Sequence, residues 1–120
     1  MKILILDDDI ERHAGFRRLL SEHLLFHAHT SRQFKALVQD NGPFDLICFD
    51  HDLGETVPEM YGSSEITGAS LAHWLLKQPK ELWPTTAWIH SHNPRGAEDI
   101  AHILTGKIPE VIRSPYKGSE

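Results

Sequence analysis

The chain has 120 residues, the length of one ordinary domain, and its hydrophobic content of 40% is enough for a normal core. Twelve basic residues against seventeen acidic ones give a net charge of −5, which argues against a protein that binds duplex DNA through its phosphates. The single cysteine, Cys48, excludes an intramolecular disulfide, and no apolar stretch is long enough for a signal peptide or a membrane span. We therefore expect one cytoplasmic domain over residues 1–120, without membrane contact.

The predicted elements alternate between strands and helices. Apolar runs typical of strands buried on both faces cover residues 2–6, 24–29, 44–50, 86–91 and 110–113. Apolar residues at helical spacing, with caps and breakers at the ends, predict helices at residues 10–23, 31–41, 69–77 and 94–106. Residues 51–68, which include Gly54, Pro58 and Gly62, are predicted to form a long loop that closes over a ligand. This order predicts a doubly wound parallel α/β sheet.

The end of the chain leaves part of this sheet uncovered. Only seven residues follow Arg113, too few for a fifth helix of normal length beside the first one. An apolar sheet face without a helix needs another cover. We therefore predict that this face is buried in a homodimer.

Polar residues stand at the point where each predicted strand ends. In open α/β sheets ligands bind beyond the carboxyl ends of the strands, so these residues are the candidates for a site. They are Asp7-Asp8-Asp9, Asp50-His51-Asp52, His90-Ser91-His92-Asn93 and Arg113-Ser114. Grouped carboxylates repel one another unless a cation neutralises them, so Asp7, Asp8 and Asp50 predict a site for Mg²⁺ or Mn²⁺. Helix capping and turn formation are the alternative roles for these aspartates.

The histidines and arginines at the same edge suggest phosphate chemistry. His90 and His92 are two residues apart, so extended geometry points both side chains the same way. As a pair they could exchange protons with a phosphodiester, or they could ligate a transition metal. Arg95 and Arg113 could bind phosphate oxygens, and salt bridges to the acidic residues are the alternative.

The chain resembles a two-component receiver domain. The resemblance rests on Asp7-Asp8 after the first strand, Asp50 at the end of the third, and Pro115-Tyr116 after the fifth. It implies a three-layer α/β/α fold with strand order 2-1-3-4-5, here without the final helix. It also implies Mg²⁺ bound by Asp7, Asp8 and the position of Asp52, with Asp50 as phosphoacceptor. His90 and Ser114 stand where receivers carry a hydroxyl residue and a lysine, which argues for another use of the site.

Two further motifs more closely resemble the variant family of cyclic-phosphate processing receiver domains: Asp50-His51-Asp52-Leu53-Gly54 and His90-Ser91-His92-Asn93-Pro94. This resemblance implies an enzyme acting on cyclic phosphates, such as RNA 2′,3′-cyclic ends or cyclic nucleotides. The leading hypothesis is a metal-dependent phosphoesterase. His90 and His92 would exchange protons, with His51 assisting; the phosphate-binding candidates are Arg95, Arg113, Ser91 and Asn93. The alternatives are a signalling receiver phosphorylated on Asp50 and a degenerate receiver that only binds a partner.

Overall fold

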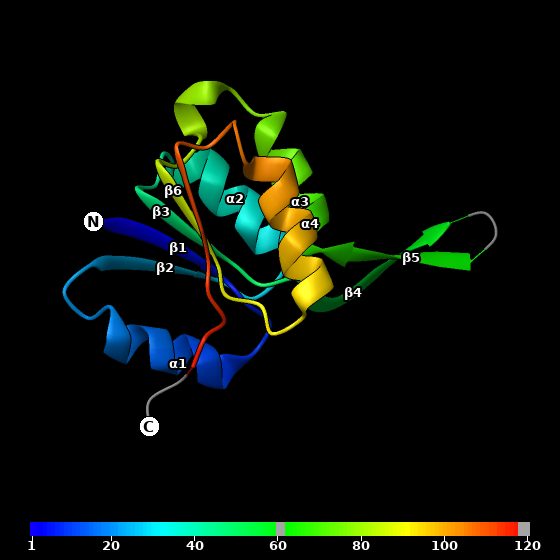
Figure 1. Ribbon diagram of the computed structural model, residues 1–120. Coiled ribbons are helices and arrows are strands. Elements are labelled where there is room, and N and C mark those ends of the chain that lie inside the picture. The colour runs from blue at the N-terminus through cyan, green and yellow to red at the C-terminus, as the bar shows by residue number, and fades with distance from the viewer. Residues whose placement is uncertain (60–61, 118–120) are drawn as a thin grey trace.

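The computed structural model describes residues 1–59 and 62–117, and its centre is a five-stranded parallel sheet. The strands lie in the order β2-β1-β3-β6-β7 (Figure 1). Their bounds are β1 (Lys2–Leu6), β2 (Leu24–Ala28), β3 (Leu46–Phe49), β6 (Thr86–Ile89) and β7 (Glu110–Arg113). Counting only the strands of this sheet, the order is 2-1-3-4-5, so the predicted α/β architecture is confirmed.

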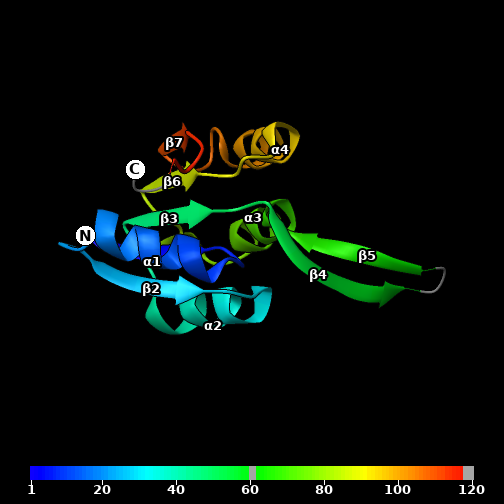
Figure 2. The same ribbon diagram turned by 90° about the horizontal axis from the view of Figure 1, so that it is seen from below.

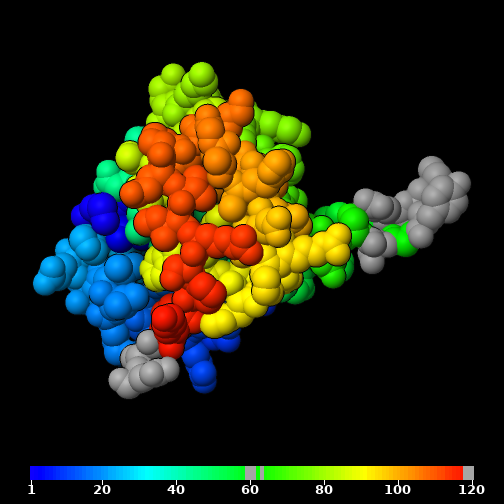
Figure 3. Space-filling model, in the orientation of Figure 1, coloured from blue at the N-terminus to red at the C-terminus, as the bar shows by residue number. Residues whose placement is uncertain are grey.

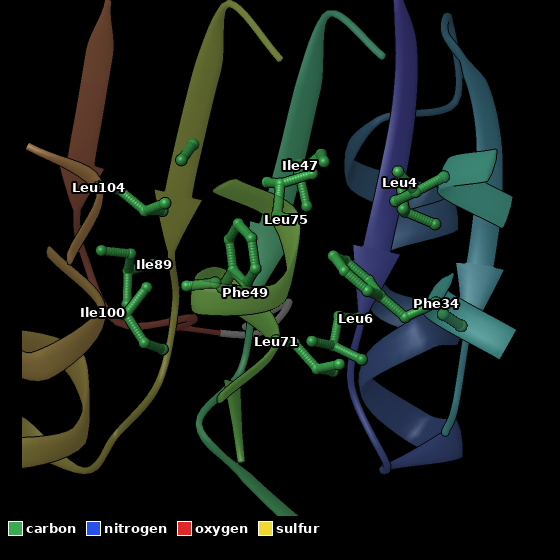
Figure 4. Packing of buried hydrophobic residues seen from close by; sticks show 14 of the residues in the cluster. Leu4, Leu6, Phe34, Ile47, Phe49, Leu71, Leu75, Ile89, Ile100 and Leu104 are labelled. Atoms are coloured by element: carbon green, nitrogen blue, oxygen red, sulfur yellow. The ribbon is translucent and has the colours of Figure 1, made fainter. Parts of the chain in front are cut away.

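Helices cover both faces of the sheet. The helices α2 (Ser31–Asn41), α3 (Gly68–Leu76) and α4 (Pro94–Leu104) pack on one face, where Phe34, Leu71 and Ile100 meet alternate strand residues such as Ile47 and Phe49 (Figure 4). The helix α1 (Ile10–Leu19) packs on the other face through Phe16. A short 3₁₀ turn, η1 (Lys80–Leu82), precedes β6. Strand side chains alternate between the two faces, so β1 and β3 are buried on both sides, whereas β6 is half-buried on the face of α1.

The ends of the elements differ from the predicted bounds by a few residues. The helix α1 ends at Leu19, four residues before the predicted end, because the backbone of Leu20 leaves the helical conformation (φ −113°, ψ 28°) and the chain then turns into β2. The strand β6 ends at Ile89, two residues before its predicted end. His90 and Ser91 therefore lie on the connection from β6 to α4.

The segment predicted as a loop is instead a β-hairpin. The strands β4 (Asp52–Glu59) and β5 (Gly62–Thr67) pair antiparallel in a sheet of their own. Gly54, at φ +66°, lies where the register shifts, and a positive φ of this kind suits glycine. The hairpin projects beyond the carboxyl end of β3 (Figure 2). Gly54, Pro58 and Gly62 suggested a loop because they weaken an ordinary strand, but a two-stranded hairpin outside the main sheet accommodates them.

The C-terminal residues cover part of the face that a fifth helix would occupy. Residues 114–117 run over the surface toward α1 (Figure 3), and the Tyr116 ring packs 4.7 Å from the Phe16 ring, centroid to centroid. An apolar groove remains beside them, lined by Met1, Leu46, Thr86, Trp88, Glu110, Ile112 and Ser114. The homodimer predicted for this face remains a prediction.

In the part of the chain that the structure describes, no helix has the length and apolar character needed to cross a bilayer.

Candidate functional site

The carboxyl ends of β1 and β3 bring two buried carboxylates together. Asp7 is fully buried, and Asp50 is 6% exposed. Arg12, on the first turns of α1, lies between them. Its Nε donates to Asp7 Oδ2 over 2.7 Å, and its Nη2 lies 2.9 Å from Asp7 Oδ1 and 3.4 Å from Asp50 Oδ2. The two acids thus share one guanidinium.

Two further aspartates lie around the same guanidinium. Arg12 Nη2 is 3.6 Å from Asp8 Oδ1, and Arg12 Nη1 is 3.5 Å from Asp9 Oδ2. Asp9 is also the N-cap of α1, because its Oδ1 accepts hydrogen bonds from the amides of Glu11 and Arg12. Capping therefore accounts for Asp9, but it does not account for Asp7, Asp8 and Asp50.

His90 connects the end of β6 to Asp7. Its Nε2 lies 3.0 Å from Asp7 Oδ2 in a fully enclosed position. An ionised Asp7 only accepts hydrogen bonds, so Nε2 carries the proton and Nδ1 is a bare acceptor. Nδ1 is buried and has no hydrogen-bond partner among the described residues, and Phe16 and Trp88 pack against the ring. This environment holds His90 neutral, and burial lowers its pKa.

The two buried acids have opposite pKa shifts. Burial alone would raise the pKa of Asp7, but hydrogen bonds from His90, Arg12 and the Asp9 amide outweigh it and lower the pKa to about 2. Asp50 has fewer such bonds. Burial and the nearby charge of Asp7 raise the pKa of Asp50 to about 7, although Arg12 acts in the opposite direction. Asp50 is thus the acid that lacks sufficient positive charge.

This shift predicts a measurable pH dependence of stability without divalent cations. Between the ordinary pKa of 3.8 and about 7, the folded state retains on Asp50 a proton that the unfolded chain has released. The free energy of unfolding therefore falls as the pH rises through this window. Asp50→Asn removes this dependence. As the pH rises from 4 to 8, the free energy of unfolding of the variant should therefore increase relative to that of the wild type by on the order of 2–4 kcal/mol.

Urea unfolding across this pH range measures the difference between the two proteins. Because histidines titrate in both, only the difference isolates Asp50. Asp40→Asn, at an exposed position of α2, is the control and should run parallel to the wild type. Parallel curves for Asp50→Asn and the wild type would contradict the assigned environment of Asp50.

A small polar cavity opens beside Asp50. Its volume is about 150 Å³, and it is lined by Arg12, Asp50, Asp52, His90, Ser91, His92 and Asn93. The connection from β6 to α4 supplies four of these residues. Asn93 is the N-cap of α4, its Oδ1 accepting from the Gly96 amide, while its Nδ2 lies 3.3 Å from Asp52 Oδ2. Acid, imidazole, hydroxyl and amide groups therefore surround a space large enough for a phosphate group.

The comparisons with known proteins agree with this geometry. The family model described as the cyclic-phosphate processing receiver domain matches residues 2–106. The chain belongs to this family. The comparison with curated proteins gives no match.

Solved structures similar to this receiver domain share its fold at low sequence identity. The N-terminal domain of a response regulator/sensory box/GGDEF protein from Carboxydothermus hydrogenoformans has a TM-score of 0.66 at 18% identity, over 94% of this chain and 81% of that one. NtrX from Brucella abortus gives 0.67 at 20%, over 97% of this chain but 24% of NtrX. A response regulator from Burkholderia pseudomallei, solved with a phosphorylated aspartic acid and a calcium ion, gives 0.66 at 18%, over 96% and 60%. Identities this low show the fold alone.

The structure brings most of the sequence-predicted residues of this receiver domain to one edge, and it separates three of them. His51 lies over the start of α4, close against Gly96, and its Nδ1 bonds to Asp52 Oδ1 over 2.9 Å. Arg113 Nη2 donates to the Pro94 carbonyl over 2.7 Å. Arg95 is exposed on the first turn of α4. None of the three lines the 150 Å³ cavity.

Sequence reasoning missed Arg12, although a signal for it exists. The residue follows Asp7, Asp8 and Asp9 by five, four and three positions, and residues three and four apart are neighbours on a helix. An arginine on the first turns of a helix after three aspartates is therefore placed to reach back to them. The structure shows that it reaches Asp50 as well.

The donor set fits a divalent cation at the buried acids. One potential ligand atom from each of Asp7, Asp50 and His90 lies within 4.8 Å of the others, and His92 is not part of this group in residues 1–59 and 62–117. Ligation through His90 Nε2 would move the ring proton to Nδ1, where no acceptor is present among the described residues. The carboxylate oxygens are therefore the better ligands, and oxygen ligands suit Mg²⁺ or Mn²⁺.

Gly68 holds α3 against the backbone next to Asp50. Its amide donates to the His51 carbonyl over 2.8 Å, and a Cβ added there would overlap the Asp50 carbonyl oxygen. We expect Gly68→Ala to lower the free energy of unfolding by about 3 kcal/mol, because the backbone cannot move aside cheaply. Gly15→Ala meets only the end of the Tyr116 side chain and should cost about 1 kcal/mol. Urea unfolding gives both values, and the reverse ranking would refute this packing.

Proposed function

We propose that this receiver domain is a metal-dependent phosphoesterase that opens cyclic phosphates by hydrolysis. The observation that carries the proposal is the shared cavity: the carboxylate of Asp50 and the imidazole of His92 face one opening of about 150 Å³. A carboxylate for a cation and an imidazole for proton transfer are what hydrolysis of a phosphodiester requires. The description of the matched family supports the choice of a cyclic phosphate.

Asp7, Asp8 and Asp50 are the residues proposed to hold the cation. When bound, Mg²⁺ or Mn²⁺ would polarise the phosphate oxygens and lower the pKa of water. Asp7 is already ionised, with a pKa of about 2, so it carries a full negative charge at neutral pH. Asp50, with its pKa of about 7, loses its proton readily when positive charge arrives.

The imidazoles have different roles in this proposal. His92 is exposed and lines the cavity, so it can take a proton from the attacking water and return it to the oxygen that leaves phosphorus. His90 donates a hydrogen bond from Nε2 to Asp7 and is 1% exposed, so it positions Asp7. Ser91 and Asn93 offer a hydroxyl and an amide to the phosphate, and Asn93 also orients Asp52.

The assay uses 2′,3′-cyclic and 3′,5′-cyclic nucleotides and an oligonucleotide with a 2′,3′-cyclic end. Each is incubated with the purified protein and Mg²⁺ or Mn²⁺, and ³¹P NMR follows the conversion of cyclic phosphate to monoester. We expect conversion of at least one substrate that stops when EDTA removes the cation. No conversion of any of them would refute the phosphoesterase.

Phosphorylation of Asp50 is the second candidate function. It is favoured by the position of Asp50 at the end of β3 and by the shared fold with a response regulator that contains a phosphorylated aspartic acid. Ser114 precedes Pro115, so Arg12 would have to supply the positive charge at the phosphoryl group. Incubation with acetyl phosphate and Mg²⁺, followed by intact mass, tests this candidate. A stable added phosphoryl group that is absent in Asp50→Asn would favour signalling over hydrolysis.

A further inference from the structure

Arg12 has no part in the proposed hydrolysis, yet it lies at the centre of the acidic residues. Its guanidinium binds both oxygens of Asp7, through Nε at 2.7 Å and Nη2 at 2.9 Å. Nη2 also reaches Asp50 Oδ2 at 3.4 Å. These oxygens belong to the carboxylates that would hold a divalent cation.

A guanidinium and a divalent cation cannot share these oxygens. Asp7 Oδ2 already accepts from both Arg12 and His90, so it has little capacity left for a cation. A guanidinium and a divalent cation bound to the same carboxylates would also repel each other strongly in a buried site. One of them has to leave before the other binds.

Arg12 is placed to leave. Its side chain is 31% exposed, whereas those of Asp7 and Asp50 are 0% and 8% exposed. The side chain can therefore turn toward solvent without opening the core. The displaced guanidinium costs little free energy, because water solvates an exposed arginine well.

We propose that Arg12 is an exchangeable internal counter-ion, which pairs with Asp7 and Asp50 in the cation-free protein and is displaced by the divalent cation. The inference rests on the cation site of the proposed function and adds its regulation. Arg12 stabilises the cation-free fold and lowers the apparent affinity for the cation. The protein then binds the cation only above a concentration that Arg12 sets.

Isothermal titration with Mn²⁺ and with Mg²⁺ tests the competition in four proteins. Arg12→Gln removes the competing charge, and we expect a dissociation constant lower by about tenfold or more. Arg12→Lys keeps the charge but loses the paired hydrogen bonds, so it should fall between Arg12→Gln and the wild type. Arg17→Gln, at an exposed position later in α1, removes the same charge away from Asp7 and should stay close to the wild type.

Thermal unfolding gives a second readout. Without cation, Arg12→Gln should melt below the wild type, because Asp7 and Asp50 lose their counter-ion. Saturating Mn²⁺ should raise its melting temperature by more than it raises that of the wild type. If Arg12→Gln does not fold, Arg12→Lys tests the competition in its place. The inference then requires that Arg12→Lys bind the cation more tightly than the wild type.

The outcomes separate the inference from the proposed function. If the wild type binds the cation and the Arg12 variants bind it no more tightly than Arg17→Gln does, the counter-ion role is wrong and the cation site stands. If neither the wild type nor any Arg12 variant binds Mn²⁺ or Mg²⁺, the cation site fails, and the inference fails with it.

Discussion

Asp50→Asn is expected to weaken binding of Mg²⁺ or Mn²⁺ by about 100-fold or more and to abolish the conversion of cyclic phosphate, because a charge next to a divalent cation contributes several kcal/mol at a partly buried site. The remaining buried acid, Asp7, is engaged by Arg12 and His90. Calorimetry measures the binding, and ³¹P NMR measures the conversion.

Loss of function in this variant cannot be attributed to unfolding. Without cation, Asp50→Asn is expected to be more stable than the wild type at neutral pH, because the pKa of Asp50 is raised to about 7 by burial and by the charge of Asp7. The matched control is Asp9→Asn, which removes one negative charge near Arg12 while asparagine still caps α1. A change of only a few fold is expected there. Equal losses in the two variants would show that general charge, rather than Asp50, holds the cation.

His92→Gln is expected to lower kcat by about 100-fold to 1,000-fold with little change in KM, because general acid–base catalysis contributes on the order of 10²–10⁴. The variant should also lose one limb of the dependence of kcat on pH. The comparison is His51→Gln: its ring lies against Gly96, bonds to Asp52 and does not line the cavity, so a loss of less than about tenfold is expected. A larger loss in His51→Gln than in His92→Gln would reverse the proposed roles.

The sheet and the placement of the acids could be predicted because they follow from strong local patterns. Buried parallel strands such as β1 and β3 are continuous apolar runs, and Asp7 and Asp50 come directly after them. Parallel strands end at the same edge of a sheet, so the two aspartates had to meet there.

The hairpin and the histidines could not be predicted in the same way. The pairing of β4 with β5 depends on contacts between two short segments whose glycines and prolines favour a loop. The alternation used for His90 and His92 applies within a strand, but β6 ends at Ile89. His90 is consequently buried, with 1% of its surface exposed, and contacts Asp7, whereas His92 is exposed and lines the cavity.

A divalent cation is expected to bind the carboxylates of Asp7 and Asp50. The most direct test is a crystal structure of the protein grown with Mn²⁺, in which anomalous scattering locates the ion. We expect one strong anomalous peak ligated by oxygens of Asp7 and Asp50, with the Arg12 side chain turned away from both. Arg12 still bonded to Asp7, with no peak at these oxygens under saturating Mn²⁺, would contradict this expectation.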